Sequence, residues 1–306
     1  MNFDEYQRRA SATDQNPTPS SQPEREESEL RRHEVIPLLG LVGEVGGLLS
    51  EYKKLLRDGA THRRFRDEVA EELGDILWYV SNVANKFDLK LSEIVSANLT
   101  KVEDRWRKPE RTKALRDETY AENQKLPRRF EYDFQHRDIG GRTKLVLIDR
   151  LNGGTAGNPL TDNAYEDDGY RYHDVLHLSF AACLGWSPVW RKLLRTEKRI
   201  TNRAPQEVDD AEDGGRAQVI EEGIVLCAYV YADSHDFMQG TKSVDWYLLQ
   251  LVKQFTAKLE VRDVTAWEWN DAILKGFSVW HQLRTHNGGV VCGDLVTGTI
   301  EFIEKR

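Results

Sequence analysis

The most constraining feature of the chain is a stretch from Leu39 to Trp106 in which carboxylates occur among apolar residues at helical spacing. Two short acidic motifs lie at its centre, Gly43-Glu44-Val45-Gly46 and Glu71-Glu72-Leu73-Gly74-Asp75. Because an α-helix has 3.6 residues per turn, this spacing points carboxylates of both motifs toward an interior. A buried carboxylate without a partner is costly, and divalent cations are common partners of carboxylate clusters. We therefore expect the chain to be organised around an acidic pair of helices.

Length and composition set the class of protein. The 306 residues are enough for one large core or two domains, and 39% apolar residues with eight Trp indicate a globular fold. The net charge of −8 argues against nucleic acid as a partner, although a metal ion can still bridge acidic side chains to a nucleotide. The three cysteines form no CxxC pair, and we find neither a signal peptide nor an apolar run of about 18 residues. These features predict a cytoplasmic protein without a membrane segment.

Helical periodicity dominates the first half of the chain. It predicts a short helix over residues 2–13, a linker over 14–23, a helix from Pro37 to about Arg57, a second from Phe65 to Phe87, and a third that Ser92 caps and that ends near Trp106. Helices with short connections form bundles. The predicted domains are an N-terminal helix with a flexible linker (residues 1–34), a helical domain (35–107), a charged connector (108–127) and a C-terminal domain (128–306).

The second half mixes both periodicities. Segments 130–134, 145–148 and 289–303 are strand-like, with Gly140-Gly141 suited to a hairpin, and they predict a small antiparallel sheet. The remaining apolar pattern predicts helices over 172–186, 189–195, 216–237, 244–259 and 264–286, with an acidic loop over 207–215. The predicted fold class is therefore mainly α, a helical bundle followed by a second helical domain with a small antiparallel β-element.

Spacing within the acidic motifs predicts a metal site. Glu44 and Glu51 are seven residues apart and share a helix face, and Glu72 and Asp75 share a face at i and i+3. Two helices side by side would bring these carboxylates together in a set that suits Mg²⁺ and a phosphate ligand. The alternative interpretation is a solvated surface of amphipathic helices. Three glycines argue against it, since each costs about 1 kcal/mol in a helix unless close packing requires it: Gly43, Gly46 and Gly74.

Residues 43–54, 71–79 and 98–105 together resemble the MazG family of all-α nucleoside triphosphate pyrophosphohydrolases, over about residues 35–107. That family has an ExxE motif followed one helix later by ExxD, and its four carboxylates bind Mg²⁺. The resemblance implies hydrolysis of a (d)NTP to the monophosphate and pyrophosphate, with Mn²⁺ as an alternative cofactor. It also implies a homodimer or a higher homo-oligomer. Glu44, Glu72 and Asp75 match the motif residue by residue as catalytic, metal-binding carboxylates.

One position departs from the family pattern. The second glutamate of ExxE falls on Gly47, which offers no ligand, and the nearest replacements are Glu51, one turn further along, and Glu71. The site is either rebuilt with Glu51, or metal binding is weakened. In the second case the protein is a nucleotide-binding sensor or regulatory module without catalysis.

Cations at two places are candidates for binding the triphosphate. Lys54 follows the first acidic motif, and the resemblance places the face of Asn98, Lys101 and Arg105 next to the nucleotide. The alternative is that these are solvated cations near helix C-termini.

A second candidate site lies in the C-terminal half. His173 and His177 are at i and i+4, a spacing that can hold a metal ion, and Glu222 lies on a later helix. This site would be a third possible location of the chemistry, and the alternative is hydrogen-bonded core histidines. Residues 216–230 also align with 67–80, which leads to the hypothesis that the second half contains a diverged copy of the bundle. From about residue 128 the chain resembles the C-terminal domain attached to some MazG-like proteins.

Overall fold

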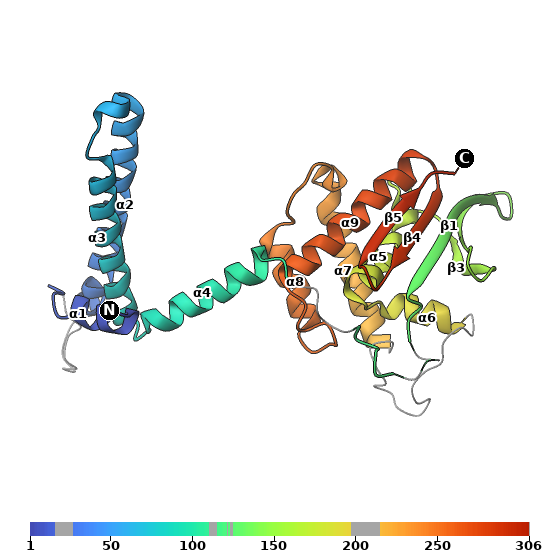
Figure 1. The fold of residues 1–306 in the computed structure, drawn as a ribbon, viewed down its shortest axis with the longest axis horizontal. Helices are drawn as coiled ribbons and strands as arrows, with labels where there is room; N and C mark the ends of the chain where they lie inside the picture. Colours follow the sequence, from blue (N-terminus) through green and yellow to red (C-terminus); the bar gives the residue numbers. More distant parts are fainter. Residues whose placement is uncertain (16–26, 110–114, 121, 123–124, 197–214, 306) are drawn as a thin grey trace. The chain divides into compact units, whose positions relative to one another are not determined.

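The structure, a computed structural model, describes residues 1–15, 27–109, 115–120, 122, 125–196 and 215–305 (Figure 1). These residues form two compact units, Met1–Glu103 and Asp104–Arg306. Residues 16–23 of the expected linker and 207–214 of the expected acidic loop lie outside the described residues. The three boundaries between the four predicted ranges remain predictions.

The N-terminal unit is built on a helical hairpin. Its elements are α1 (Phe3–Ser11), α2 (Glu27–Asp58), the 3₁₀ turn η1 (Gly59–Thr61), α3 (Phe65–Lys86) and α4 (Leu91–Trp106), whose last turn belongs to the second unit. α2 and α3 run side by side over most of their length, and α1 packs against α3 (Figure 1). This pairing brings the two acidic motifs onto adjacent helices.

Two helix starts differ from the sequence prediction. α2 begins at Glu27 and contains Pro37, because good helix formers precede the proline and the helix gives up a single backbone hydrogen bond there. Ser92 lies inside α4 and does not cap it. The backbone N–H of Leu91 donates instead to Oε1 of Gln7 at 2.7 Å, while Nε2 of Gln7 donates to the backbone oxygen of Leu89 at 2.8 Å. A side chain 84 residues away thus holds this helix end.

The N-terminal unit leaves much apolar surface uncovered. On α2 the side chains of Val42 and Leu49 are 70% and 65% exposed, and Leu73 on α3 is 51% exposed. Within the described ranges one helical stretch, His33–Thr61, has the length and hydropathy of a membrane span, although only 11% of its apolar window is buried. A single helix of this kind is weak evidence for a span. Such exposure indicates a surface that another apolar surface covers.

The C-terminal unit contains a five-stranded antiparallel sheet of order β3-β2-β1-β4-β5. The strands are β1 (Arg129–Asp138), β2 (Thr143–Asp149), β3 (Thr155–Leu160), β4 (Gly289–Asp294) and β5 (Thr299–Ile303). β1 lies at the centre, with Phe134 opposite Leu147 on β2 and Gly289 on β4. The chain end therefore returns to pair with the first strand of the unit.

Helices cover this sheet and complete the core. They are α5 (Asp174–Leu184), α6 (Pro188–Thr196), α7 (Gly215–Asp233), α8 (Trp246–Thr256) and α9 (Ala266–Thr285), with 3₁₀ turns η3 (Tyr170–Tyr172) and η5 (Asp236–Met238). α5 and α9 pack on each other and on β4 and β5 (Figure 1). The two helices approach closely at Gly276, where an added Cβ would lie 2.6 Å from Cδ2 of Leu176. Trp269, Phe277 and Trp280 of α9 are fully buried in this core.

The predicted mainly α fold with a small antiparallel sheet is confirmed. One strand was missed: β3 reads TAGNPL, and its Gly157 and Pro159 hide the strand pattern. Of its residues only Ala156 is buried, as expected for an edge strand.

Candidate functional site

Two glycines fix the register of the acidic hairpin. An added Cβ at Gly40 would lie 2.7 Å from the Tyr79 hydroxyl oxygen, and one at Gly47 would lie 2.6 Å from the carboxylate carbon of Glu72. The two glycines are seven residues apart on α2, and their partners are seven apart in reverse order on α3. α2 and α3 are therefore antiparallel and in close contact along this face.

The prediction that Gly43, Gly46 and Gly74 are required for close packing is wrong within the described residues. An added Cβ at Gly43, Gly46 or Gly74 would meet no described atom within 4 Å. Close packing is needed instead at Gly47, because the carboxylate of Glu72 lies in the space that a side chain there would enter. The position that interrupts the ExxE pattern is thus the position that accommodates a carboxylate from the facing helix.

Glu72 lies at the centre of a cluster of like charges. Burial raises the pKa of Glu72, and the nearby carboxylates of Glu44, Glu51, Asp75 and Glu71 raise it further. Its Oε2 atom is buried and has no hydrogen-bond partner among the described residues. A buried, unpartnered carboxylate oxygen among other carboxylates fits a divalent cation, which would supply the missing positive charge.

Glu51 differs from Glu72 because both of its oxygens have partners. Lys54 donates to Oε1, and Nε2 of His62 lies 2.9 Å from Oε2. The hydrogen bond from Lys54 is the largest cause of a lowered Glu51 pKa. Glu51 is buried beside the cluster, and its charge is already balanced by these neighbours. A metal ion that uses Glu51 in place of a residue at position 47 would have to compete with Lys54.

The cations expected to hold phosphates are placed differently from one another. Lys54 lies close enough to Glu72 for that carboxylate to raise its pKa, although the hydrogen bond to Glu51 contributes most. Asn98 and Lys101 are exposed on α4, while the Arg105 guanidinium lies 5.2 Å from the Trp246 ring within the C-terminal unit. The groups that most shift the Glu72 pKa all come from α2 and α3. The described contacts therefore add Lys54 to the carboxylate cluster, and the role of the three α4 residues stays a prediction.

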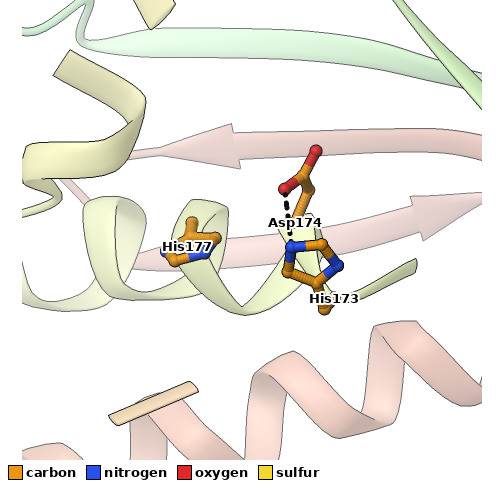
Figure 2. A group of neighbouring side chains, drawn as sticks. All are labelled: His173, Asp174 and His177. Carbon is orange, nitrogen blue, oxygen red and sulfur yellow. Dashed lines mark ion pairs between the residues drawn. The ribbon is translucent and has the colours of Figure 1, made fainter. Parts of the chain in front are cut away.

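The candidate residues of the C-terminal unit do come together. His173 precedes α5, Asp174 begins it, and His177 lies one turn later (Figure 2). One ligand atom from each of these three side chains lies within 4.8 Å of the other two. Nε2 of His177 is 3.4 Å from a carboxylate oxygen of Glu222 on α7. Sequence analysis identified both histidines and Glu222 but missed Asp174, which the adjacent His-Asp pair could have signalled.

A fully buried carboxylate supports this cluster. Oε1 of Glu221 accepts hydrogen bonds from Nδ1 of His177 at 2.8 Å and from the Ser187 hydroxyl at 2.7 Å. The backbone N–H of Val189 donates to the other oxygen of Glu221 at 2.8 Å. Burial alone would lower the pKa of His177, but Glu221 and Glu222 raise it to about 10. Glu221 was not among the predicted site residues, because only its neighbours in the fold reveal its role.

Comparison with known proteins agrees with this division of the chain. The MazG nucleotide pyrophosphohydrolase domain matches residues 37–111, and the MazG C-terminal domain matches residues 111–306. The Gene 37 protein of Mycobacterium phage L5 is 44% identical over 69 residues, which are 22% of this chain. The chain spans 60% of the length of that phage protein. No solved structure matches the chain.

An acidic helical hairpin followed by an α-rich unit with a small sheet therefore defines a protein of the nucleotide pyrophosphohydrolase type. The matched regions cover both units, and the chain belongs to the MazG family. The resemblance noted from the acidic motifs is confirmed.

Proposed function

We propose that this protein is a Mg²⁺-dependent nucleoside triphosphate pyrophosphohydrolase that converts a (d)NTP to the (d)NMP and pyrophosphate. One observation carries the proposal: the buried Oε2 of Glu72 has no hydrogen-bond partner among the described residues and lies among further carboxylates. A hydrogen-bonded surface carboxylate would need no cation. The buried oxygen of Glu72 lacks such a partner among the described residues, which supports a bound cation, and triphosphate substrates arrive with a divalent cation.

Glu44, Glu72 and Asp75 are the proposed metal-binding and catalytic residues, and Glu51 completes the set. The antiparallel register places Glu44 opposite Asp75, since each lies four residues from the Gly40 and Tyr79 contact. Bound Mg²⁺, or Mn²⁺ in its place, would offset phosphate charge and lower the pKa of a water molecule. A carboxylate oxygen of Glu72 that the ion leaves free could accept the proton of that water as the water oxygen bonds to the α-phosphorus. The bond from this phosphorus to the bridging oxygen then breaks, and pyrophosphate leaves.

Phosphate binding is proposed for Lys54, Asn98, Lys101 and Arg105. Lys54 is already next to the cluster, so it can exchange its Glu51 contact for a phosphate oxygen. Asn98, Lys101 and Arg105 of α4 would contact the phosphates only when a substrate or a second subunit is bound. This contribution rests on the family resemblance.

A homodimer, or a higher homo-oligomer, is the proposed assembly. The exposed apolar side chains of α2 and α3, including Val42, Leu49 and Leu73, form a surface that a second copy can cover. Covering this surface would also account for the exposed apolar helical stretch His33–Thr61, which by length and composition alone could cross a membrane. A cytoplasmic location and a lack of nucleic acid partners are proposed from the composition and the charge of −8.

Product analysis with a panel of (d)NTPs tests this proposal. The full chain should release pyrophosphate and monophosphate with Mg²⁺ or Mn²⁺, and chelation of the metal should stop release. Release of inorganic phosphate alone would contradict the proposed bond cleavage. Thermal stabilisation by a nucleotide without any product would instead support the nucleotide-binding sensor. In that alternative the missing carboxylate at Gly47 has abolished catalysis and left nucleotide binding intact.

A further inference from the structure

We propose that the C-terminal unit has a second, separate site for a divalent transition-metal ion, with Zn²⁺ as the best-matched ion. Its ligands are the Nε2 atoms of His173 and His177 and carboxylate oxygens of Asp174 and Glu222. The proposal does not depend on the activity of the acidic hairpin, because every ligand lies in the other unit.

The spacing of the donor atoms suits one ion. Atoms bound to the same Zn²⁺ at about 2.0–2.2 Å lie no more than about 4.4 Å apart. One donor atom from each of His173, Asp174 and His177 already lies within 4.8 Å of the others (Figure 2). Nε2 of His173 is 3.4 Å from Oδ1 of Asp174, and Nε2 of His177 is 3.4 Å from Oε2 of Glu222. Side-chain rotations would have to shorten the longest of these separations to bring the atoms onto an ion.

The hydrogen bonds of both imidazoles leave the same nitrogen for a metal. Nδ1 of His173 contacts the backbone oxygen of Tyr170 at 2.8 Å, and Nδ1 of His177 contacts Glu221 at 2.8 Å. Since those partners accept hydrogen bonds, each Nδ1 carries a proton, and Nε2 is the nitrogen left for a metal ion. The raised pKa of His177 keeps a proton on its Nε2 at neutral pH, and a bound metal ion would displace that proton. Metal-bound histidines generally donate their other N–H to a carboxylate or a backbone carbonyl in this way.

A buried nitrogen of the cluster makes no hydrogen bond. The side chain of His177 is 3% exposed, and its Nε2 makes no hydrogen bond to any residue that the structure describes. The contact with Glu221 uses Nδ1, and Nε2 lies 3.4 Å from the Glu222 carboxylate. A metal ion held between Nε2 and this carboxylate would give both a partner. Glu222 is 47% exposed at the edge of the cluster, which gives an ion a route from solvent.

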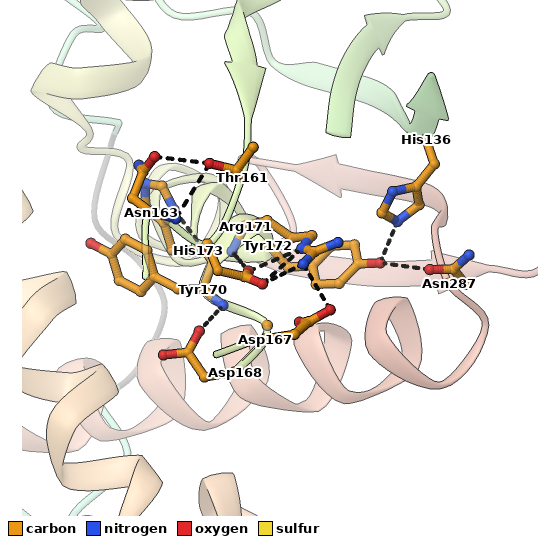
Figure 3. A network of polar contacts seen from close by, with 12 residues as sticks. His136, Thr161, Asn163, Asp167, Asp168, Tyr170, Arg171, Tyr172, His173 and Asn287 are labelled. Carbon is orange, nitrogen blue, oxygen red and sulfur yellow. Dashed lines mark hydrogen bonds and ion pairs between the residues drawn. The ribbon is translucent and has the colours of Figure 1, made fainter. Parts of the chain in front are cut away.

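The turn that carries His173 is held firmly in position (Figure 3). Nε of Arg171 donates to both oxygens of the buried Asp162 at 3.0 Å, and the Arg171 backbone N–H donates to one of them at 2.7 Å. The Tyr172 hydroxyl and Nε2 of His136 are 2.8 Å apart. The contacts of the two residues that precede His173 therefore preorganise this ligand.

The donor set also selects the kind of ion. Two imidazole nitrogens with carboxylate oxygens favour Zn²⁺ and neighbouring transition metals, whereas Mg²⁺ prefers oxygen ligands alone. The two sites of the protein should consequently differ in ion preference. The acidic hairpin is matched to Mg²⁺, and the histidine cluster to Zn²⁺.

Equilibrium binding of Zn²⁺ and Co²⁺ to the full chain, in excess Mg²⁺, tests the proposal. Wild type should bind one Zn²⁺ per chain, and Co²⁺ should give the visible absorption of a nitrogen- and oxygen-ligated ion. His173→Gln should weaken binding at least 10-fold, and Asp174→Asn should alter the Co²⁺ spectrum. His286→Gln, outside the cluster, and Glu72→Gln, in the other unit, should bind like wild type.

Because His177 is buried and its replacement can unfold the unit, His173→Gln is the main variant, with circular dichroism to confirm its fold. Absence of a bound Zn²⁺ overturns the proposal and leaves His177 and Glu221 as an ion pair between two helices. Binding that survives His173→Gln in a folded protein overturns it too. Loss of binding in Glu72→Gln places the ion at the acidic hairpin and has the same consequence.

Discussion

Gly47→Ala should separate the stability of the acidic hairpin from its activity. The added Cβ would lie 2.6 Å from the Glu72 carboxylate carbon, and ordinary carbon contacts need about 3.5 Å or more, so that carboxylate must move by about 1 Å. It can do so at little cost in free energy of unfolding, since it is the free end of a flexible side chain. The backbone of α2 need not shift.

The two expected effects have opposite signs. Replacing a helical glycine by alanine should raise the free energy of unfolding by about 1 kcal/mol. Displacing a catalytic carboxylate by about 1 Å should lower Mg²⁺-dependent turnover by about 100-fold. Gly74→Ala is the matched control, because an added Cβ there meets no described atom within 4 Å. It should gain the same stability and keep its activity.

Urea unfolding and a pyrophosphate-release assay on the three proteins check this reasoning. Wild-type turnover in a stabilised Gly47→Ala protein would show that the position of the Glu72 carboxylate is unimportant. An equal loss of turnover in Gly74→Ala would show that helix flexibility, and not the contact at Gly47, controls activity.

Three further outcomes are expected. Lys54→Met removes the main cause of the low Glu51 pKa, so the acid limb of the kcat/KM profile should move to higher pH. An unchanged pH profile would show that Glu51 takes no part in the reaction. Arg171→Met should destabilise the C-terminal unit by about 3 kcal/mol in urea unfolding at pH 7 by leaving buried Asp162 unpaired. Burial raises the Asp162 pKa, but Arg171 lowers it below its ordinary value of 3.8. The ion pair therefore stabilises the fold above about pH 4, and the difference in free energy of unfolding between wild type and Arg171→Met should shrink as the pH falls further. A difference that stays constant with pH would contradict this. Val42→Asp changes a side chain that is 70% exposed in one copy and should convert the proposed dimer to monomers in light scattering, whereas a dimer that persists would mean that the interface lies elsewhere.

The helices of this chain were readable from sequence because their apolar periodicity is strong. The acidic motifs also predicted which two helices face each other. The start of α4 could not be predicted, because Gln7 caps it from α1 through a contact that only the folded unit creates. β3 escaped notice because a glycine and a proline interrupt an edge strand with a single buried residue.

The candidate site shows the same limit. Spacing alone indicated Glu44, Glu72 and Asp75, since helical periodicity places them on facing surfaces. The loss of a ligand at Gly47 stays a prediction, and its packing role could not be foreseen because the carboxylate that occupies the space beside it comes from the facing helix. The neighbours of Glu51 were equally hidden, as His62 lies beyond the helix end and reaches Glu51 only when the hairpin turns back. The suggested repeat of the bundle in the second half remains a prediction.

If a cation held at Glu72 supports hydrolysis, removal of this carboxylate charge should abolish turnover. Pyrophosphate release by Glu72→Gln is measured beside wild type and beside Glu93→Gln, an exposed control on α4. We expect metal-dependent release by wild type and by the control, and a loss of at least 100-fold in Glu72→Gln. Wild-type release by a folded Glu72→Gln protein, or no release by wild type with Mg²⁺ or Mn²⁺, would contradict it.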